Sequence, residues 1–346
     1  MKKEVIVYGA GQMGRAVCSI LEANDTMVRK IVDKGMTEPK TVFGGHREIP
    51  AIHPEGMDSE DWKLDVIVSI TAVSFFEVKT YLKQLGAENV FPAGDYLEKI
   101  FRGAFTNCGC LNEMQYETAL KIKWDDEESG REWKMACDWF YNRNEKFAVQ
   151  TGFRPDREKY FPDFIRKLLS TGDVMIDGAY LDGAYSKKFV ELTGGRVYAF
   201  SLVPQESPKV SPEKAVQLEA RELAGMTGEV VRNRAGLMKP FNISREYRAN
   251  TVSVDDYVAE KGIPVMYLRA YSMSEILDLL MGAKKTIDTC RPIIAANLAH
   301  YMTDFLLVPY FLKLYCRDYL FLFRMHSFQG NDCLMYAIPM ERKEYE

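Results

Sequence analysis

The sequence predicts an α/β protein with two parallel-sheet domains, the second of which ends in an antiparallel β-hairpin. Short apolar runs alternate with amphipathic helical stretches over residues 4–93 and again from residue 174. The last two strand-like runs, at 319–327 and 333–339, are separated mainly by the turn-rich stretch FQGND. Parallel strands need a helical crossover whereas antiparallel strands need only a turn, so these two strands should form a hairpin. The 346 residues also exceed what one small core organises, which favours two domains.

Composition and charge exclude several kinds of protein. The 45 basic and 49 acidic residues leave a net charge of −4, and no run of Lys or Arg exceeds a pair, so no nucleic-acid-binding surface is expected. No apolar run approaches the roughly 20 residues of a membrane span, and a strand starts directly after MKKE, which argues against a signal peptide. Seven scattered cysteines favour a reducing compartment, and we expect a cytoplasmic protein. Cys108 and Cys110 lack further ligands nearby, so no metal site is predicted.

A glycine-rich turn follows the first predicted strand, Glu4–Tyr8. It reads Gly9-x-Gly11-x-x-Gly14 and leads into an amphipathic helix, and the next strand ends at Asp33. Gly9 permits a tight turn, Gly11 lets the backbone approach a phosphate, and Gly14 lets the helix pack closely on the strand. An acid placed like Asp33 suits a ribose hydroxyl. This pattern predicts a Rossmann-like nucleotide-binding domain.

A third strand–helix unit completes this domain, which we place at residues 1–100. Strand 65–70 precedes a helix that begins at the capping box Ser74-x-x-Glu77, and strand 89–93 follows. Five short strands are expected. The alternation then stops, so the domain is too small to be a complete dehydrogenase.

Residues 3–97 resemble the N-terminal nucleotide-sugar-binding domain of bacterial sugar acetyltransferases, which also opens with a strand, YGAG, a helix and VD. The resemblance implies a nucleotide-sugar pocket near Gly9–Gly14 and Asp33. Two alternatives stay open: NAD bound at the same loop, and a Rossmann-like domain that binds no ligand.

Residues 101–165 are predicted to form a helical connector. Residues 111–145 read as helices around the acidic turn Asp125–Glu128. This stretch also carries the aromatic residues Trp124, Trp133, Trp139, Phe140 and Tyr141. We expect these rings to hold the two domains together, because aromatic side chains with polar tips suit a half-solvated junction. Stacking on a sugar is the alternative interpretation.

The second sheet is expected within residues 166–346. Strands are predicted at 174–177, 196–202, 229–233, 264–271 and 292–300, ahead of the final hairpin. Helices are predicted at 184–192, 212–226, 273–287 and 304–316. Strand–helix units closed by an antiparallel hairpin predict a sheet of seven strands.

Several segments resemble FkbM-type methyltransferases, in particular members that carry a small Rossmann domain in front. They are WDDEESGREW, EKYFPDFI, VSVDDYVAEKGIPV, LLMGAKKTI, FLKLY, and FRMHS followed by LMYAIP. The resemblance spans nearly the whole chain. It implies a class I methyltransferase-like seven-stranded sheet that binds S-adenosylmethionine and methylates a sugar or polyketide hydroxyl, often in surface-glycan pathways.

The cofactor positions of that family are only partly kept. The family's first loop has the form Asp-x-Gly-Ala-Tyr-Asp-Gly-Asp-Thr; Asp177, Asp182 and Gly183 stand in register with it. Ala179 replaces its first glycine. The family's second strand ends AFEP, with a glutamate that holds the cofactor ribose, and Ser201 stands at the acid's position. The resemblance therefore makes Asp177, Asp182, Gly183 and Ser201 the candidate cofactor-binding residues.

The family's fourth strand ends K-M-D-I-E-G-A-E, with acids that border the reaction centre. Residues 269–276 read RAYSMSEI instead, so both leading acids are absent, although Ser272-x-x-Glu275 is a good capping box for the next helix. Losing one carboxylate-to-hydroxyl bond costs roughly 1.5–3 kcal/mol, about ten- to a hundred-fold in affinity. Changes at three separate motifs predict an impaired cofactor site.

Two histidines are candidates for a general base. His300 ends the fifth strand, with Asp304 four residues later, and His326 lies in the sixth strand between Arg324 and Ser327. A histidine at the carboxyl edge of a sheet, where α/β proteins bind ligands, suits proton removal. The alternative is a histidine that supports a neighbouring loop. His300 is the candidate catalytic residue.

Three functional hypotheses follow. The first is an S-adenosylmethionine-dependent O-methyltransferase acting on a sugar or nucleotide-linked sugar, which the resemblance favours. The second is a non-catalytic nucleotide-sugar-binding protein on a methyltransferase scaffold, which the replaced cofactor residues favour. The third is an NAD-dependent enzyme that uses Gly9–Gly14. The sequence leaves the acceptor, the pathway and the oligomeric state open, a homo-oligomer included.

Overall fold

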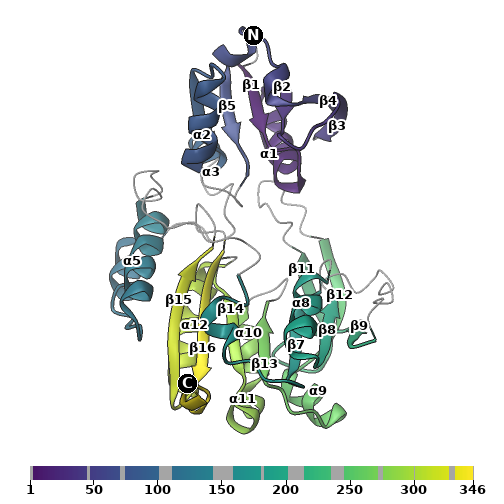
Figure 1. The fold of residues 1–346 in the computed structure, drawn as a ribbon, viewed down its shortest axis with the longest axis vertical. Coiled ribbons are helices and arrows are strands. Elements are labelled where there is room, and N and C mark those ends of the chain that lie inside the picture. Colours follow the sequence, from purple (N-terminus) through teal and green to yellow (C-terminus); the bar gives the residue numbers. More distant parts are fainter. Residues whose placement is uncertain are drawn as a thin grey trace.

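The computed structural model describes residues 3–44, 47–70, 75–100, 111–142, 159–180, 183–201, 214–234, 245–271, 276–299, 301–326 and 332–345. Within these residues the chain forms one six-stranded, one seven-stranded and one three-stranded sheet. Figure 1 shows the two larger sheets, each with its own helices. This architecture confirms the predicted α/β fold class.

The N-terminal sheet has the strand order β3-β4-β2-β1-β5-β6. Its pairs are parallel except β3 with β4. Its strands are β1 (Lys3–Tyr8), β2 (Thr26–Val32), β3 (Lys40–Gly44), β4 (Arg47–Ile52), β5 (Asp65–Val68) and β6 (Asn89–Pro92). Its helices are α1 (Gln12–Ala23), α2 (Phe75–Gln84), α3 (Ala93–Ile100) and the short 3-10 turns η1 (Pro54–Gly56) and η2 (Asp61–Lys63).

Five strands were expected for this sheet, only four of which were assigned to residues, and the structure has six. The antiparallel pair β3–β4 was not predicted, because the stretch is polar, contains Pro50 and shows no regular alternation. Its place in the sheet comes from β4, which aligns in parallel with β2 so that Ile31 lies beside Ala51. That pairing buries Ile31 and Ala51 in the sheet core, and it is a tertiary contact that local sequence does not reveal.

The C-terminal sheet has the order β15-β16-β14-β13-β7-β8-β9. Its pairs are parallel except those of β16 with β14 and β15, which confirms the predicted final hairpin. Its strands are β7 (Val174–Tyr180), β8 (Arg196–Ser201), β9 (Val216–Glu219), β13 (Tyr267–Ala270), β14 (Ile293–Asn297), β15 (Tyr319–Met325) and β16 (Cys333–Pro339). Its helices are α7 (Asp163–Arg166), α8 (Ala184–Thr193), α9 (Val254–Lys261), α10 (Ile276–Met281), α11 (Lys284–Cys290), α12 (Met302–Tyr315) and the terminal 3-10 turn η5 (Met340–Tyr345).

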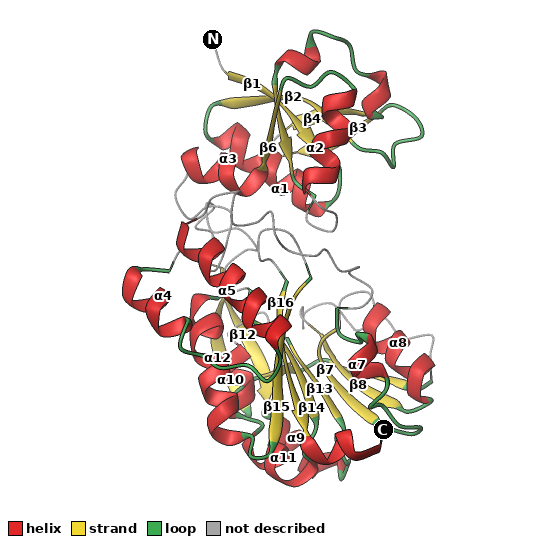
Figure 2. Cartoon of the chain, turned by 60° about the vertical axis from the view of Figure 1, so that its left-hand side comes forward, coloured by secondary structure: helices red, strands yellow, loops and turns green. Residues whose placement is uncertain are grey.

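Helices cover both faces of this sheet, as Figure 2 shows. On one face Ile176 and Leu268 pack in a cluster with Leu279 of α10 and Phe305 of α12. On the other face Met175 of β7 and Tyr267 of β13 pack in a cluster with Phe189 of α8 and Ile165 of α7. Because successive strand residues point to opposite faces, a sheet covered on both sides needs the continuous apolar runs that these strands have.

The predicted helix at 212–226 was wrong where the structure describes it. Residues 216–219 form β9 at the edge of the seven-stranded sheet, and Glu222–Leu223 form β10. β10, β12 (Arg245–Val252) and β11 (Gly228–Arg234) make the three-stranded sheet, so the strand predicted at 229–233 lies outside the main sheet. The charged and apolar residues of this stretch fit a helical period, but hydrogen bonding of β9 to β8 decides the conformation.

The predicted helix at 273–287 is two helices, α10 and α11. Gly282 separates them at a close approach of two segments, because a Cβ there would lie 2.4 Å from the carbonyl oxygen of Ala224. The capping box predicted at Ser272 and Glu275 lies outside the described residues, as does Ser74 of the one predicted before α2.

The predicted connector contains α4 (Glu113–Ala119) and α5 (Glu127–Asn142). The ring of Trp133 in α5 stacks on Phe305 of α12 at 4.4 Å and meets Phe323 of β15 edge-on at 5.0 Å. These contacts join α5 to the seven-stranded sheet. A role for the aromatic residues between the two domains stays a prediction, as do the domain boundaries.

Three polar side chains, one just before α5 and two in its first half, also cover the edge of the sheet. Asp125, Ser129 and Glu132 accept the backbone N–H groups of alternate β15 residues. Those donors belong to Phe321, Phe323 and Met325, at 2.6, 2.8 and 2.7 Å respectively. An edge strand otherwise exposes such groups for pairing with other chains, so α5 closes this edge.

Candidate functional site

Four parallel strands, β7, β8, β13 and β14, direct their carboxyl ends to one edge of the seven-stranded sheet. α/β proteins bind ligands at this edge. β7 and β13 approach each other closely there, because a Cβ on Gly178 would lie 2.4 Å from the carbonyl oxygen of Tyr271. Gly178 therefore has to be glycine, a requirement that the sequence did not reveal.

Asp177 lies at the centre of this edge, and its carboxylate is bonded within the protein. Its Oδ1 accepts from Nη1 of Arg269 at 2.5 Å and from the backbone N–H of Ala179 at 3.1 Å. Its Oδ2 accepts from the hydroxyl of Ser186 in α8 at 2.7 Å. Only 1 % of Asp177 is exposed. The side chain thus ties together β7, β13 and the first turn of α8.

Arg269 is the partner of Asp177 on the neighbouring strand, and it is only 2 % exposed. Three tyrosine rings surround its guanidinium, with centroids at 4.2 Å for Tyr160, 4.5 Å for Tyr185 and 5.4 Å for Tyr271. Burial opposes the charge, but the attraction of Asp177 outweighs it, so the pKa of Arg269 is raised. Ring faces stabilise a desolvated cation further. We call Arg269 and its three rings the tyrosine cage.

A second buried polar cluster lies close to the cage. The ammonium of Lys159 forms an ion pair with Asp332, which also accepts from the Asn297 side chain at 3.1 Å. Nε2 of His326 lies 2.8 Å from the hydroxyl of Tyr336, and that hydroxyl donates to the carbonyl oxygen of Lys159. Because the single Tyr336 proton is used there, His326 Nε2 must be the donor in its own bond.

The segment Lys159–Phe161 connects the two clusters, although none of its residues was predicted as a site residue. The carbonyl oxygen of Tyr160 accepts from the hydroxyl of Tyr267 at 2.5 Å, and its ring is part of the cage. Phe161 packs near Tyr267 and Phe189 in the core below the edge. In sequence it lies within EKYFPDFI, one of the segments that resemble FkbM-type methyltransferases, but no site residue was assigned to it.

The other predicted residues of this sheet have mixed positions. Gly183 adopts a φ of +78° at the start of α8, where a Cβ would also lie 2.5 Å from the Tyr180 hydroxyl, so glycine is required. Ser201 is the last residue of β8. Asp182 and His300 lie outside the described residues.

Asp304 and Arg324, the sequence neighbours of the two candidate histidines, hold structural positions. The two carboxylate oxygens of Asp304 accept the N–H groups of Ile276 and Leu277, each at 2.9 Å, and so cap α10. Arg324 forms ion pairs with Asp126 and Glu128 next to α5. Both contacts hold helices against the sheet.

The glycine turn of the N-terminal sheet has the geometry that its pattern predicts. Gly9 has a φ of +113°, and a Cβ on Gly14 would lie 1.8 Å from the carbonyl oxygen of Gly9. A Cβ on Gly11 would meet nothing within 4 Å. Asp33 accepts the N–H groups of Ala10 at 2.7 Å and Gly35 at 2.8 Å, so its carboxylate fastens the turn. The residues of this turn lie together, and nucleotide binding by them stays a prediction.

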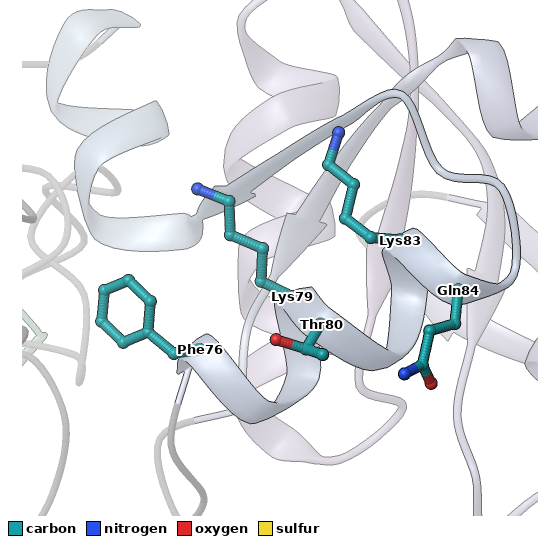
Figure 3. A pocket seen from close by; sticks show the side chains of 5 residues that line it. All are labelled: Phe76, Lys79, Thr80, Lys83 and Gln84. Carbon is teal, nitrogen blue, oxygen red and sulfur yellow. The ribbon is translucent and has the colours of Figure 1, made fainter.

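A shallow hollow of about 460 Å³ lies along the outer side of α2. Figure 3 shows the five side chains that line it, Phe76, Lys79, Thr80, Lys83 and Gln84. All five come from one helix, and the ammonium of Lys83 donates to the carbonyl oxygen of Glu88. A surface of this kind carries no specific chemistry by itself.

Metal ligands and membrane spans were searched for throughout the part of the chain that the structure describes. Within it, no three His, Cys, Asp or Glu side chains gather as a metal site, and Cys108 and Cys110 fall outside it. Within the same ranges no helix has the length and apolar character needed to cross a membrane.

Comparison with known proteins gives one informative match. No family model matches the sequence, and no curated protein matches it significantly. Among solved structures the chain is similar to the methyltransferase FkbM from Methylobacillus flagellatus KT, with 15 % identity and a TM-score of 0.64. The alignment covers 97 % of this chain and 90 % of that chain. The two proteins therefore share a fold along nearly their whole lengths.

Proposed function

We propose that this protein is an S-adenosylmethionine-dependent methyltransferase of the FkbM type, acting on a hydroxyl of a sugar or glycan precursor. One observation carries the proposal. This chain shares its fold with the FkbM methyltransferase over 97 % of its length. That fold includes the seven-stranded sheet in the order β9-β8-β7-β13-β14-β16-β15, with β16 antiparallel between β14 and β15. Ligands of open α/β sheets bind at the carboxyl edge, which is where the candidate residues of β7 and β8 lie.

The residues at this edge fit a nucleoside cofactor in part. Gly178 lets β7 approach β13 closely, and Gly183 allows the positive φ at the start of α8. Ser201 at the end of β8 would bond a ribose hydroxyl. The cofactor would supply a methyl group on a sulfonium, which is already electrophilic. The chain's own task is then to position the two reactants and to remove a proton from the acceptor. His300 is the proposed base.

Asp177 has a positioning role in this proposal. Both of its carboxylate oxygens are bonded to protein groups, so it holds the β7 loop against β13 and α8. We assign contact with the cofactor to residues 182, 183 and 201. The N-terminal turn at Gly9–Gly14, with Asp33 behind it, would hold the nucleotide part of a nucleotide-linked acceptor.

A second candidate function is favoured by the tyrosine cage. Tyr185 and Tyr271 lie against Arg269, a cation of the protein itself that is paired with Asp177. A methyltransferase scaffold whose edge is filled in this way suits a non-catalytic protein that binds a nucleotide-sugar through its N-terminal domain.

Calorimetric titration with S-adenosylmethionine and S-adenosylhomocysteine separates these functions. We expect micromolar binding, and we expect Ser201→Glu to tighten it by about ten-fold or more, because the substitution places an acid where the family holds the ribose. Thr118→Glu, which adds the same charge on the exposed side of α4, is the matched control and should leave the affinity unchanged. No binding at millimolar ligand by the wild type and Ser201→Glu would exclude the methyltransferase and leave the second candidate.

A further inference from the structure

The outward side of α12 is mainly apolar. Its exposed residues are Thr303, Leu307, Tyr310 and Leu314, which are spaced four, three and four positions apart and so lie on one side of the helix. Leu314 is 76 % exposed. The single acid of α12, Asp304, is buried where it caps α10. A surface helix normally turns polar residues to water, so the apolar stripe Leu307–Tyr310–Leu314 indicates a contact surface.

The stripe continues onto α4. The hydroxyl of Tyr310 donates to the carbonyl oxygen of Thr118 at 3.0 Å, and Figure 2 shows α4 and α12 on the same side of the sheet. Met114, one turn before Thr118, is also exposed. These side chains project from the outer sides of two helices. A protein partner needs a complementary shape to pack on such ridges, whereas the headgroup region of a bilayer adapts to them and favours tyrosine.

Lysine ammonium groups lie on both sides of the stripe. Lys284 of α11 lies 4.8 Å from the ring centroid of Tyr315, and Lys313 lies 4.3 Å from that of Phe321. Neither lysine forms an ion pair among the described residues. Burial lowers the pKa of Lys313, and the attraction of Asp125 does not offset it. Both cations therefore lack a close counter-charge within the protein.

Positive charge also prevails around the stripe. We considered residues 113–123, 284–290 and 302–318, which hold α4, α11, α12 and the turns after α4 and α12. The cations there that reach solvent are Lys121, Lys123, Lys284, Lys285, Lys313 and Arg317. The acids that do so are Glu113, Glu117, Asp288 and Asp318. A second copy bound through the same surface would set these cations against its own, so charge favours an anionic partner.

We propose that the apolar stripe of α12, with its flanking lysines, binds the surface of an anionic lipid bilayer. The three side chains of the stripe enter the headgroup region, and the ammonium groups beside them face lipid phosphates. Binding there does not depend on the proposed methyl transfer.

Flotation with lipid vesicles tests this binding. We expect the wild type to bind vesicles of phosphatidylcholine mixed with phosphatidylglycerol, to ignore phosphatidylcholine alone, and to be released by added salt. Leu314→Asp should weaken the binding by about ten-fold or more, because an apolar side chain is lost from the bilayer and an acid is added. Lys284→Gln should weaken it by about five-fold, because one cation is lost.

Met226→Asp is the matched control. Met226 is 64 % exposed between β10 and β11 and gains the same acid, so its vesicle binding should equal that of the wild type. Thermal unfolding checks that the variants stay folded; if Leu314→Asp does not, Lys284→Gln decides alone. Unchanged binding by the stripe variants, or equal binding to both kinds of vesicle, overturns the proposal. Absence of vesicle binding also does so, and a dimer that Leu314→Asp separates in light scattering would then assign the stripe to a second copy.

Discussion

The carboxylate of Asp177 and the guanidinium of Arg269 pair across two neighbouring parallel strands, with Oδ1 and Nη1 2.5 Å apart and each side chain 2 % exposed. The strand register places the two residues side by side, so the contact follows directly from the pairing of β7 with β13. A buried ion pair adds little net stability over an apolar pair, because both charges lose their hydration. Its contacts instead hold β7, β13 and α8 in one arrangement at the carboxyl edge of the sheet.

Removing one charge of this pair should be strongly destabilising. Asp177→Asn leaves the Arg269 cation buried without its counter-charge, and we expect a loss of about 3–5 kcal/mol in the free energy of unfolding of the C-terminal sheet. Urea denaturation followed by tryptophan fluorescence measures it. The matched control is Asp163→Asn, whose carboxylate pairs with Arg166 but is 81 % exposed, so its effect should stay within about 0.5 kcal/mol. Equal effects would mean that burial of the pair is unimportant.

Two alanine substitutions in the N-terminal turn should have opposite outcomes. Gly14→Ala places a Cβ 1.8 Å from the Gly9 carbonyl oxygen, so α1 must shift and the N-terminal domain should unfold at lower temperature. Gly11→Ala meets nothing within 4 Å and should leave the unfolding midpoint unchanged. If a phosphate binds at this turn, Gly11→Ala will still weaken a nucleotide-sugar in calorimetry. A stable Gly14→Ala variant would contradict the close packing of α1 on β1.

The hydrogen bonds between α5 and the edge strand β15 predict the effect of removing the hydroxyl of Ser129. Ser129 accepts from the Phe323 N–H at 2.8 Å and from Arg324 at 2.6 Å. Ser129→Ala leaves both donors without that acceptor, so we expect a loss of about 1–3 kcal/mol and a greater tendency to aggregate. Lys134→Ala, on the exposed side of the same helix, is the control and should change stability by less than about 0.5 kcal/mol. Calorimetry and light scattering measure the two effects.

Tyr271 should contribute to the alkaline limit of stability. Burial, reinforced by Tyr160, raises the pKa of Tyr271 to about 12, above the value of about 10 for an unfolded tyrosine. Because the folded state holds the phenolic proton more tightly, this contribution is fully present below about pH 10 and is lost as the pH rises through about 12. Tyr271→Phe should therefore flatten the fall of the urea midpoint between these pH values.

The matched control for this titration is Tyr141→Phe, because Tyr141 is 39 % exposed on α5. It should leave the slope of the midpoint against pH unchanged. An identical slope for Tyr271→Phe and the wild type would show that Tyr271 does not couple to folding.

Local sequence predicted those parts of the site that depend on backbone shape. Gly9 and Gly14 are required by a turn and a close approach, and both were marked by the spacing of the glycines. Gly183 was found through the family loop and is required by its positive φ. In each case the constraint acts within a few residues of the chain, so the pattern of residue types records it.

The side-chain partners at the edge could not be predicted in this way. Arg269 was noted only as the start of a stretch that lacks the family's acids, and Tyr160 only as part of EKYFPDFI, a segment that resembles the family. They meet because the hydroxyl of Tyr267 on β13, 107 positions away in sequence, donates to the backbone carbonyl oxygen of Tyr160. The sequence showed that the family's acids are absent after the fourth strand. It did not show that Arg269 and the rings of Tyr185 and Tyr271 would pack together there.

The sequence by itself determined the class of fold, the strand–helix alternation and the final hairpin, because hydrophobic period and turn residues act locally. Only the tertiary structure decided that residues 216–219 form an edge strand and that β3 and β4 extend the N-terminal sheet. It also decided that Asp177 forms an ion pair with Arg269. Those outcomes depend on strand pairing and on which side chains share a buried volume. Partners distant along the chain decide both, and no local window of residues contains them.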